Sequence, residues 1–155
     1  MPGTALRSQV VAMTPMYRLT AGGAELQAAF DLRRQVFVEE QGISGELEFD
    51  GLDDEAIHMI AVDGGKVVGT ARVRLGADNQ AKIERMAVAK SARRKGIGRG
   101  MVAFLIAECR AREMRHVILH AQHHVVPFYR SCGFEEVGEP FREAGIKHIG
   151  MQLWL

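Results

Sequence analysis

The residues best suited to chemistry lie between Ile83 and Gly100, where the chain reads IERMAVAKSARRKGIGRG. A β-like segment leads into a basic, glycine-rich turn, and a helical pattern follows. Gly96 and Gly98 lack side chains, so backbone N–H groups can close on a pyrophosphate at the helix N-terminus, where unpaired amides and the helix dipole favour anions. The turn also carries four cationic residues, Arg93, Arg94, Lys95 and Arg99. This segment predicts a phosphate cradle.

Two common nucleotide-binding motifs do not fit this turn. A P-loop needs a lysine followed by Ser or Thr at the helix start, whereas Ser91 precedes the glycines here. The dinucleotide fingerprint needs G-x-G-x-x-G directly after a strand, but the spacing here is G-x-G-x-G after a long cationic approach. The run Arg93–Lys95 suits a ligand with more phosphate than NAD, such as coenzyme A with its 3′-phosphate.

At these residues the sequence resembles the GNAT superfamily of N-acyltransferases, whose signature Q/R-x-x-G-x-G/A is matched by Arg93, Gly96 and Gly98. A second element, PFYRSCGFEEVGE, is similar to the later helix and strand of that superfamily. Within it, VFVEEQGISGELEFDGLDDEAIH and PFREAGIKHIGM look like the YjcF/ElaA-like branch, which is similar in layout to glucosamine-phosphate acetyltransferases. The resemblance covers Tyr17 to Leu155 and implies an α+β GNAT fold, with a central mixed, mostly antiparallel sheet flanked by helices.

The resemblance also implies acetyl-CoA as co-substrate, without a metal. In the superfamily the central strand splays from its neighbour, and its backbone, here at Met86 and Val88, binds the pantetheine arm and faces the thioester carbonyl. Tyr129 matches the tyrosine that protonates the departing thiolate, and Gln122 stands where many relatives carry Asn. The implied cofactor-binding residues are Met86, Ala87, Val88, Arg93, Arg94, Lys95, Gly96, Ile97, Gly98, Arg99, Gln122 and Phe128.

An acetyl transfer to an amine needs a proton acceptor, because a primary alkyl amine with a pKa of about 10.4 is protonated at neutral pH. Glu84 is the first candidate, since it precedes Met86 by two on an alternating strand and so shares its side. His120 is the second candidate, because imidazole can take up a proton near neutral pH. Each has a structural alternative: Glu84 at the surface, His120 in the core or at the surface, and Tyr129 as a packing aromatic.

Composition indicates a single enzyme domain. The chain has 155 residues, 47% of them hydrophobic, with 20 basic against 19 acidic residues, which does not suit a nucleic-acid binder. Residues 15–155 are expected to form the domain and 1–14 a flexible leader. Two cysteines, Cys109 and Cys132, are too few for a disulfide framework and favour a reducing cytoplasm. No membrane span or secretion signal is indicated.

Although the net charge is close to zero, the charged residues are concentrated in two stretches of opposite sign. The stretch Glu46–Glu55 holds six acids and no base, while Lys90–Arg99 holds five bases and no acid. The acidic stretch either attracts a cationic amine, such as a polyamine, or is a solvated loop. Resemblance to amino-sugar enzymes favours a sugar phosphate instead. Glu143 and His148 are further candidates for the acceptor pocket.

Hydrophobic periodicity predicts the elements in order. Helices are expected at 24–40, with Leu26, Phe30, Leu32 and Phe37 inward, at 96–113 and at 123–131. The inward residues of the second helix are Ile97, Met101, Val102, Leu105 and Cys109. Strands are expected at 16–20, 58–62, 66–75, 82–89, 116–121, 134–138 and 148–153, and a loop at 42–54. In strand 66–75, Val67, Ala71, Val73 and Leu75 should share a buried face.

The sequence thus predicts a cytoplasmic acetyl-CoA-dependent N-acetyltransferase that transfers the acetyl group directly to a small-molecule amine, with no nucleic-acid or membrane partner. Two other classes remain open: a non-catalytic acyl-CoA sensor, and a nucleic-acid-binding module that uses the cationic turn. A covalent acyl-enzyme through either cysteine has no motif support. Trp154, with Leu153 and Leu155, either supplies an edge contact in a homodimer or packs in the core.

Overall fold

Seven strands form one sheet in the computed structural model, which describes residues 14–155. The predicted leader, residues 1–14, lies outside the described residues except for its last one. The strands are β1 (Met16–Leu19), β2 (Ile57–Asp63), β3 (Lys66–Leu75), β4 (Gln80–Val88), β5 (His116–Gln122), β6 (Glu135–Glu143) and β7 (Ile146–Trp154). Their order is β1-β2-β3-β4-β5-β7-β6, and only β4 and β5 pair in parallel among the described strands. The predicted mixed, mostly antiparallel sheet is confirmed.

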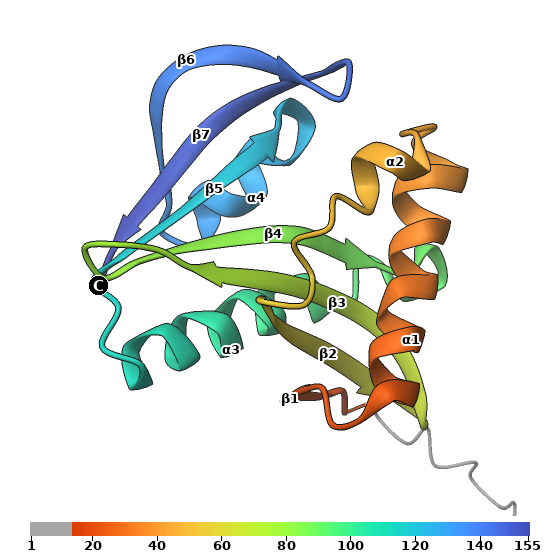
Figure 1. Ribbon diagram of the computed structural model, residues 1–155. Helices are drawn as coiled ribbons and strands as arrows, with labels where there is room; N and C mark the ends of the chain where they lie inside the picture. The colour runs from red at the N-terminus through yellow and green to blue at the C-terminus, as the bar shows by residue number, and fades with distance from the viewer. Residues whose placement is uncertain (1–13) are drawn as a thin grey trace, which may run out of the picture.

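Helices cover both faces of the sheet (Figure 1). On one face, α1 (Gly23–Arg33) runs directly into a π-helix, η1 (Arg34–Glu40), and the short helix α2 (Gly45–Glu48) follows. On the other face lie α3 (Ile97–Ala111) and α4 (Val126–Ser131). Two single turns of 3₁₀-helix, η2 (Lys90–Ala92) and η3 (His123–Val125), precede α3 and α4. Sequence reasoning missed α2, which Ser44 caps through its hydroxyl.

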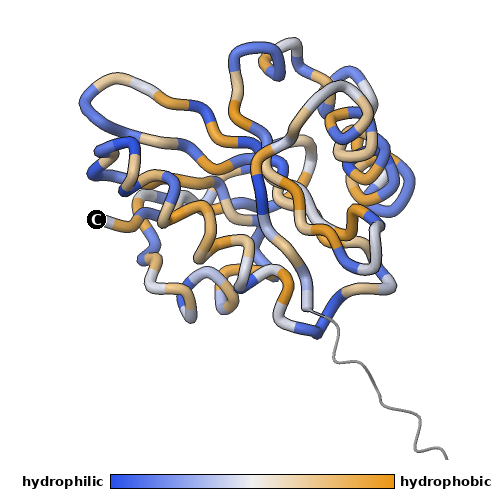
Figure 2. Tube along the Cα trace, turned by 90° about the horizontal axis from the view of Figure 1, so that it is seen from below, coloured by the Kyte–Doolittle hydropathy of each residue, from blue (hydrophilic) through white to orange (hydrophobic). Residues whose placement is uncertain are grey.

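The main core lies between the sheet and α3. All five residues predicted to face inward on this helix are buried: Ile97, Met101, Val102, Leu105 and Cys109. On the other face, Leu32 and Phe37 are buried as predicted, whereas Leu26 and Phe30 are half-buried. Hydrophobic colour in Figure 2 is accordingly interrupted along the helices, whose outer sides meet water.

The buried face predicted for β3 is only partly right. Ala71 and Val73 pack in the α3-side core, but Leu75 is 43% exposed. Because helices cover both faces of this central strand, every residue from Val68 to Val73 is buried, including Arg72. A charged residue therefore lies inside the domain at a place where simple alternation predicts an outward side chain.

The C-terminal hairpin is longer than predicted, because β6 and β7 continue to a tight turn at Ala144 and Gly145, both with positive φ. Trp154 at its end is 64% exposed and stacks on His116 with ring centroids 3.8 Å apart. The alternative that Trp154 packs in the core is therefore wrong. Its role in a dimer stays a prediction.

Candidate active site

The parallel pair at the centre of the sheet separates halfway along its length. β4 and β5 pair from Gln80–Ile83 to His116–Leu119, and each strand then continues without pairing to the other. In Figure 1 the two strands start side by side and then diverge. We call the separated segments, Glu84–Val88 and His120–Gln122, the splay. Strand edges without a neighbour present N–H and C=O groups, so the splay offers two strand edges to a ligand.

A bulge in β4 decides which side chains face each side of the splay. Arg85 has a φ of 54°, and the register between β3 and β4 shifts between Thr70 and Arg72. An extra residue in a bulge reverses the alternation of the side chains that follow it. Glu84 consequently contacts Arg72 on the α1 and α2 side, while Met86 packs against the α3-side core. The argument from alternation that placed Glu84 and Met86 on one side is wrong.

The predicted cradle lies at the N-terminus of α3. Gly96 is the N-cap residue and has a φ of 80°, which a side chain would strain, and Arg94 before it also has positive φ. Gly98 needs its glycine for another reason, because a Cβ there would lie 3.3 Å from the ring of Phe128. Arg94 and Lys95 are exposed. Unpaired helix amides with two exposed cations beside them are suited to bind phosphate.

The other two arginines of the turn are held by protein groups. Arg93 donates from Nε to the carbonyl of Val88 at 3.0 Å, and its two terminal nitrogens lie 2.7 and 2.8 Å from the carboxylate of Glu40. The Arg93 hydrogen bonds lower the pKa of Glu40. Arg99 reaches the hydroxyl of Ser131 at 2.8 Å. Arg93 therefore ties the end of β4 and the end of η1 to the cradle.

Tyr129 projects from α4 into the α3-side core, where it is 8% exposed. Its hydroxyl donates to the sulfur of Met86 at 3.3 Å, and its ring packs edge-on against Phe128 and Phe134. Burial raises the pKa of Tyr129, so the phenol is protonated at neutral pH. The structure thus places a protonated phenol against the strand that borders the splay.

Glu84 is surrounded by cations. Its Oε2 atom accepts hydrogen bonds from both Arg72 and Arg74, its Oε1 atom accepts one from Arg74, and the ammonium of Lys82 lies 3.1 Å from Oε1. Burial alone would raise the Glu84 pKa, but the hydrogen bonds from Arg74 and Arg72 outweigh it and lower the pKa to about 2. A carboxylate held in this way is a poor proton acceptor at neutral pH, which argues against Glu84 as the general base.

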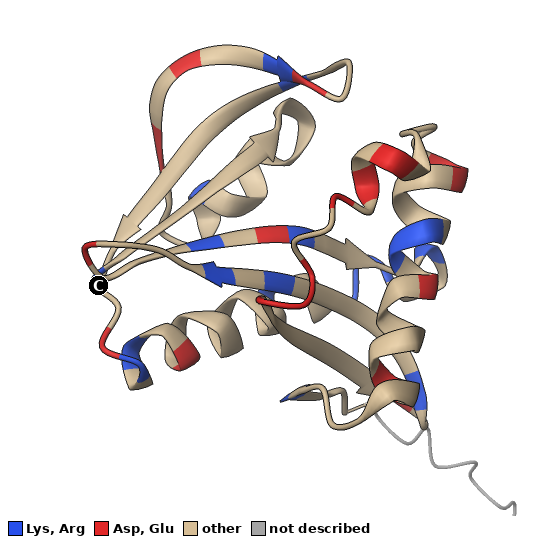
Figure 3. Cartoon of the chain, in the orientation of Figure 1, with Lys and Arg blue, Asp and Glu red and all other residues tan. Residues whose placement is uncertain are grey.

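Glu84 belongs to a larger network of buried charges that joins α1, α2, β3 and β4. Arg72 also contacts Asp50 and Asp53, both at 2.9–3.0 Å, and Arg33 contacts Asp53 and Glu48, both at 2.7 Å. Arg33 and Arg72 are each 1% exposed. Figure 3 shows the basic and acidic bands side by side on β3, β4 and the segment after α2.

The acidic stretch Glu46–Glu55 divides into two groups. Glu46, Asp54 and Glu55 are exposed, as the solvated-loop alternative expects. Glu48, Asp50 and Asp53 are neither a free attractant for a cationic acceptor nor a solvated run, because arginines pair with all three. Burial raises the Glu48 pKa, whereas hydrogen bonds from Arg72 lower that of Asp50. Sequence reasoning missed these partners. A signal was present in Arg33, which follows the buried Leu32 on the apolar side of its helix.

His120 lies on the other strand of the splay, directly after the last paired residue, Leu119. Its Nδ1 atom is 3.2 Å from Glu143, and its ring meets Phe141 edge-on at 4.9 Å. Glu143 also lies 3.7 Å from Nε2 of the buried His148. Glu143 and His148, predicted for the acceptor pocket, and His120, the second candidate base, thus come together on one face of the C-terminal half of the sheet, which consists of β5, β7 and β6.

Gln122 ends β5 and donates a hydrogen bond to Gln41 at 2.8 Å. Gln41 follows η1, so this contact joins the two halves of the sheet across the splay. The amide that replaces the usual Asn therefore has a protein partner, and pantetheine contact by Gln122 stays a prediction.

Both cysteines are free thiols, Cys109 buried and Cys132 half-buried. Burial raises the pKa of Cys109, which disfavours the thiolate that an acyl-enzyme would need. Within residues 14–155, no three His, Cys, Asp or Glu side chains are grouped to hold a metal ion. No helix in the same residues is long and apolar enough to span a membrane.

The sheet, its splay and the cradle define an acyl-CoA N-acyltransferase fold. The family model described as "Acetyltransferase (GNAT) domain" matches residues 27–155, so the chain belongs to the GNAT acetyltransferases. It is 38% identical to the uncharacterized N-acetyltransferase YjcF of Bacillus subtilis over 128 residues, covering 82% of this chain and 91% of YjcF.

Two further comparisons agree with this assignment. Protein ElaA of Escherichia coli is 31% identical over 132 residues, covering 83% of this chain and 86% of ElaA. The crystal structure of a putative N-acetyltransferase from Lactobacillus plantarum superposes with a TM-score of 0.84 at 29% identity, covering 93% of this chain and 99% of that one. The resemblance to the YjcF/ElaA-like branch is confirmed.

The charge network predicts a specific acid sensitivity. The Glu84 pKa is lowered from 4.5 to about 2, so its contribution to stability is complete above pH 4.5 and is lost as pH falls toward 2. We expect the free energy of unfolding of the wild type to fall across this window, and Glu84→Gln to show a shallower fall. Denaturant titrations at a series of pH values measure both slopes.

The matched control for this prediction is Glu46→Gln, which removes an exposed carboxylate of α2. Its pH dependence should follow that of the wild type. Equal slopes for Glu84→Gln and the wild type would show that Glu84 is not stabilised by its cations.

Proposed function

We propose that this protein is an acetyl-CoA-dependent N-acetyltransferase that moves the acetyl group directly from the thioester to a primary amine in a ternary complex. The observation that carries the proposal is the unpaired edge of β4, which runs from the cradle to the point where β4 and β5 separate. Tyr129 lies on one face of the sheet at the splay, and His120 lies on the other. In this proposal Tyr129 is the proton donor on one face of the sheet and His120 is the proton acceptor on the other.

The cradle residues fit acetyl-CoA. Amides at Gly96, Ile97 and Gly98 would bind the pyrophosphate, and Arg94 and Lys95 would add charge. Arg93 would act through position rather than by direct contact, since Glu40 holds its guanidinium. Along β4, the backbone of Met86, Ala87 and Val88 would bind the pantetheine arm, with Phe128 closing the cradle against Gly98. When bound, acetyl-CoA supplies the activated acetyl group.

The protein groups then have separate tasks. The neutral amine attacks the thioester carbonyl, and a backbone N–H of the splay stabilises the oxyanion. The C–S bond breaks, and Tyr129 gives its proton to the departing thiolate or holds it by a hydrogen bond. The amine proton goes to His120, whose Nδ1 atom is held by Glu143. Support for His120 over Glu84 comes from the cations that occupy both oxygens of Glu84.

The two other functions find less support. For a nucleic-acid module, the net charge of the cationic turn is reduced, because Arg93 is paired with the carboxylate of Glu40. A non-catalytic sensor would need neither the Tyr129 hydroxyl beside the splay nor a carboxylate beside His120, although the Tyr129 ring also packs in the core. A cytoplasmic location is part of the proposal and is supported by the two free cysteines.

The function is tested with acetyl-CoA and a broad panel of primary amines. We expect acetyl-CoA to raise the melting temperature and free thiol to be released only when an amine is present. Duplex DNA serves as the competing ligand. Stabilisation by DNA and not by acetyl-CoA would contradict the proposal, and binding of acetyl-CoA without thiol release from any amine would favour the sensor.

Tyr129→Phe should lower kcat by roughly 100-fold, because the thiolate loses its proton donor. The melting temperature should stay close to that of the wild type, since the hydroxyl contacts only the sulfur of Met86 among the described residues. Steady-state kinetics and thermal unfolding measure the two effects. The control is Tyr17→Phe, the same change at the chain's other tyrosine, in β1. Equal kcat in both variants would remove Tyr129 from the mechanism.

His120→Gln should lower kcat/KM by roughly 100-fold at neutral pH, because the amine proton loses its acceptor. The comparison variant is His124→Gln, which changes an exposed histidine of η3 and should keep the wild-type kcat/KM. Steady-state kinetics measure both variants. A His120→Gln enzyme with the wild-type kcat/KM would exclude His120 as the base.

A further inference from the structure

The ion-pair network around Glu84 holds more positive than negative charge. Five cationic side chains and four carboxylates make up the network around Glu84: Arg33, Arg72, Arg74, Lys82 and Arg85 against Glu48, Asp50, Asp53 and Glu84. The surplus is one positive charge. The network includes three acids of the stretch Glu46–Glu55, which the sequence analysis considered as a binding site for a cationic amine.

The surplus lies at the accessible side of the network. The side chains of Arg74 and Lys82 are 37% and 24% exposed, whereas that of Glu84 between them is 9% exposed. Arg74 and Lys82 are also direct cross-strand partners in the antiparallel pair of β3 and β4. Like charges directly opposite each other destabilise a sheet. This pair has one carboxylate for two cations, and that carboxylate is shared with Arg72.

Hydrogen-bond capacity leads to the same conclusion. An ammonium group has three donors and a guanidinium has five, while a carboxylate has about four acceptor positions. Glu84 already receives four hydrogen bonds from Arg72 and Arg74. Among the described residues, Glu84 is also the one acceptor near the Lys82 ammonium. Donors on Lys82 and Arg74 are therefore left for a further anion.

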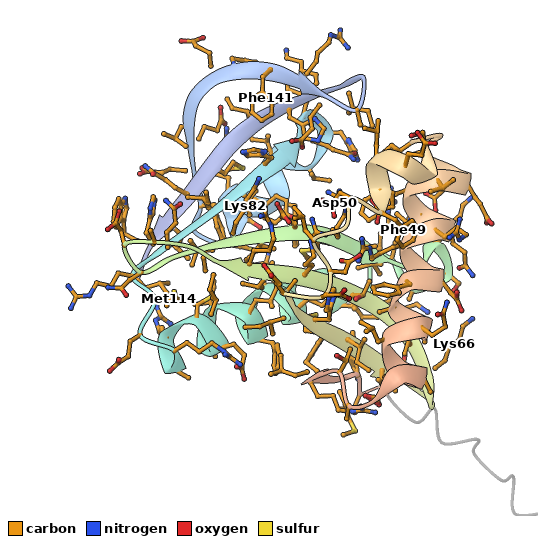
Figure 4. The ribbon with its side chains drawn as sticks, in the orientation of Figure 1. Phe49, Asp50, Lys66, Lys82, Met114 and Phe141 are labelled. Atoms are coloured by element: carbon orange, nitrogen blue, oxygen red, sulfur yellow. The ribbon has the colours of Figure 1, made fainter. Side chains whose placement is uncertain are left out.

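These donors lie beside the reaction site. Lys82 is paired with Ile118 of β5, two residues before His120, and its contact with Glu84 puts it on the side of the sheet that Glu84 faces. Figure 4 labels Lys82 beside the diverging strands, with Asp50 nearby. The same figure labels Lys66 far away, at the corner near the start of α1.

We propose that the acceptor is a primary amine that also carries an anionic group, a carboxylate or a phosphate, and that Lys82 and Arg74 bind this group while the amine faces His120. This inference rests on the proposed acetyltransferase function and adds the substrate class. It replaces the cationic acceptor that the acidic stretch suggested. The contribution of Lys82 and Arg74 is electrostatic and lies close to water, so it weakens as salt increases.

Matched acceptors test the substrate class. Each pair shares one amine and differs in charge: ethanolamine with phosphoethanolamine, glucosamine with glucosamine 6-phosphate, and alaninamide with alanine. Spermidine represents the cationic class. We expect kcat/KM to be at least about tenfold higher for anionic members, and the ratio to shrink between low and high salt. The phosphate and carboxylate pairs show which anion is preferred.

Variants test the residues. Lys82→Gln should raise KM for the anionic acceptor by roughly tenfold and change the uncharged partner little, while Lys82→Arg should restore most of the difference. Lys66→Gln makes the same change of charge at an exposed lysine far from Lys82 and should behave like the wild type. An equal effect of Lys82→Gln on both members of a pair would overturn the assignment to Lys82.

The outcomes separate this inference from the function on which it rests. Turnover that favours spermidine or the uncharged member of every pair overturns the anionic acceptor and leaves the acetyltransferase intact. Acetyl-CoA binding without turnover of any acceptor overturns both. A preference for anionic members that Lys82→Gln abolishes, and Lys66→Gln does not, supports the inference.

Discussion

The guanidinium of Arg72 is the group on which the charge network on the α1 and α2 side of the sheet depends. It is almost completely buried and contacts three carboxylates, Asp50, Asp53 and Glu84. Through them it joins the segment after α2 to β3 and β4. Removing one partner of a buried ion pair typically costs about 3–5 kcal/mol, because the other charge stays buried without compensation. One wall of the splay is therefore held by charge pairing, and its donors are oriented before any substrate arrives.

Much of the fold could be predicted because it follows from local patterns. The 3.6-residue period located α3 and its buried residues, and glycine spacing located the turn at its N-terminus. The charge network could not be predicted because, apart from Lys82 and Glu84, its ion-paired partners lie 10 to 37 residues apart in the chain. The bulge at Arg85 was equally hidden, since arginine gives no local signal for positive φ. Its guanidinium bonds to the carbonyls of Leu47 and Glu48, which helps to hold this unfavourable backbone.

That single bulge changes the chemistry that the strand can support. Without it, Glu84 and Met86 would face one way, and one side of the sheet would carry both the carboxylate and the contact to Tyr129. With it, Met86 meets Tyr129 on the α3 side, and His120 and Glu143 lie on the exposed side of the C-terminal half of the sheet. The proposed proton donor and the proposed proton acceptor thus lie on opposite faces of the sheet, so neither can transfer a proton directly to the other.

The π-helix η1 has a consequence for how this family can vary. The hydrogen bond from the amide of Gln41 to the carbonyl of Val36 spans five residues, so the turn is wider than in an α-helix. A wider turn rotates the residues at its end, and here Glu40 meets Arg93 on one half of the sheet while Gln41 meets Gln122 on the other. The helix end acts as a spacer between the two halves. Deleting one residue within Arg34–Glu40 would let the helix persist while misaligning both contacts, so chain length in this segment is constrained by the width of the splay.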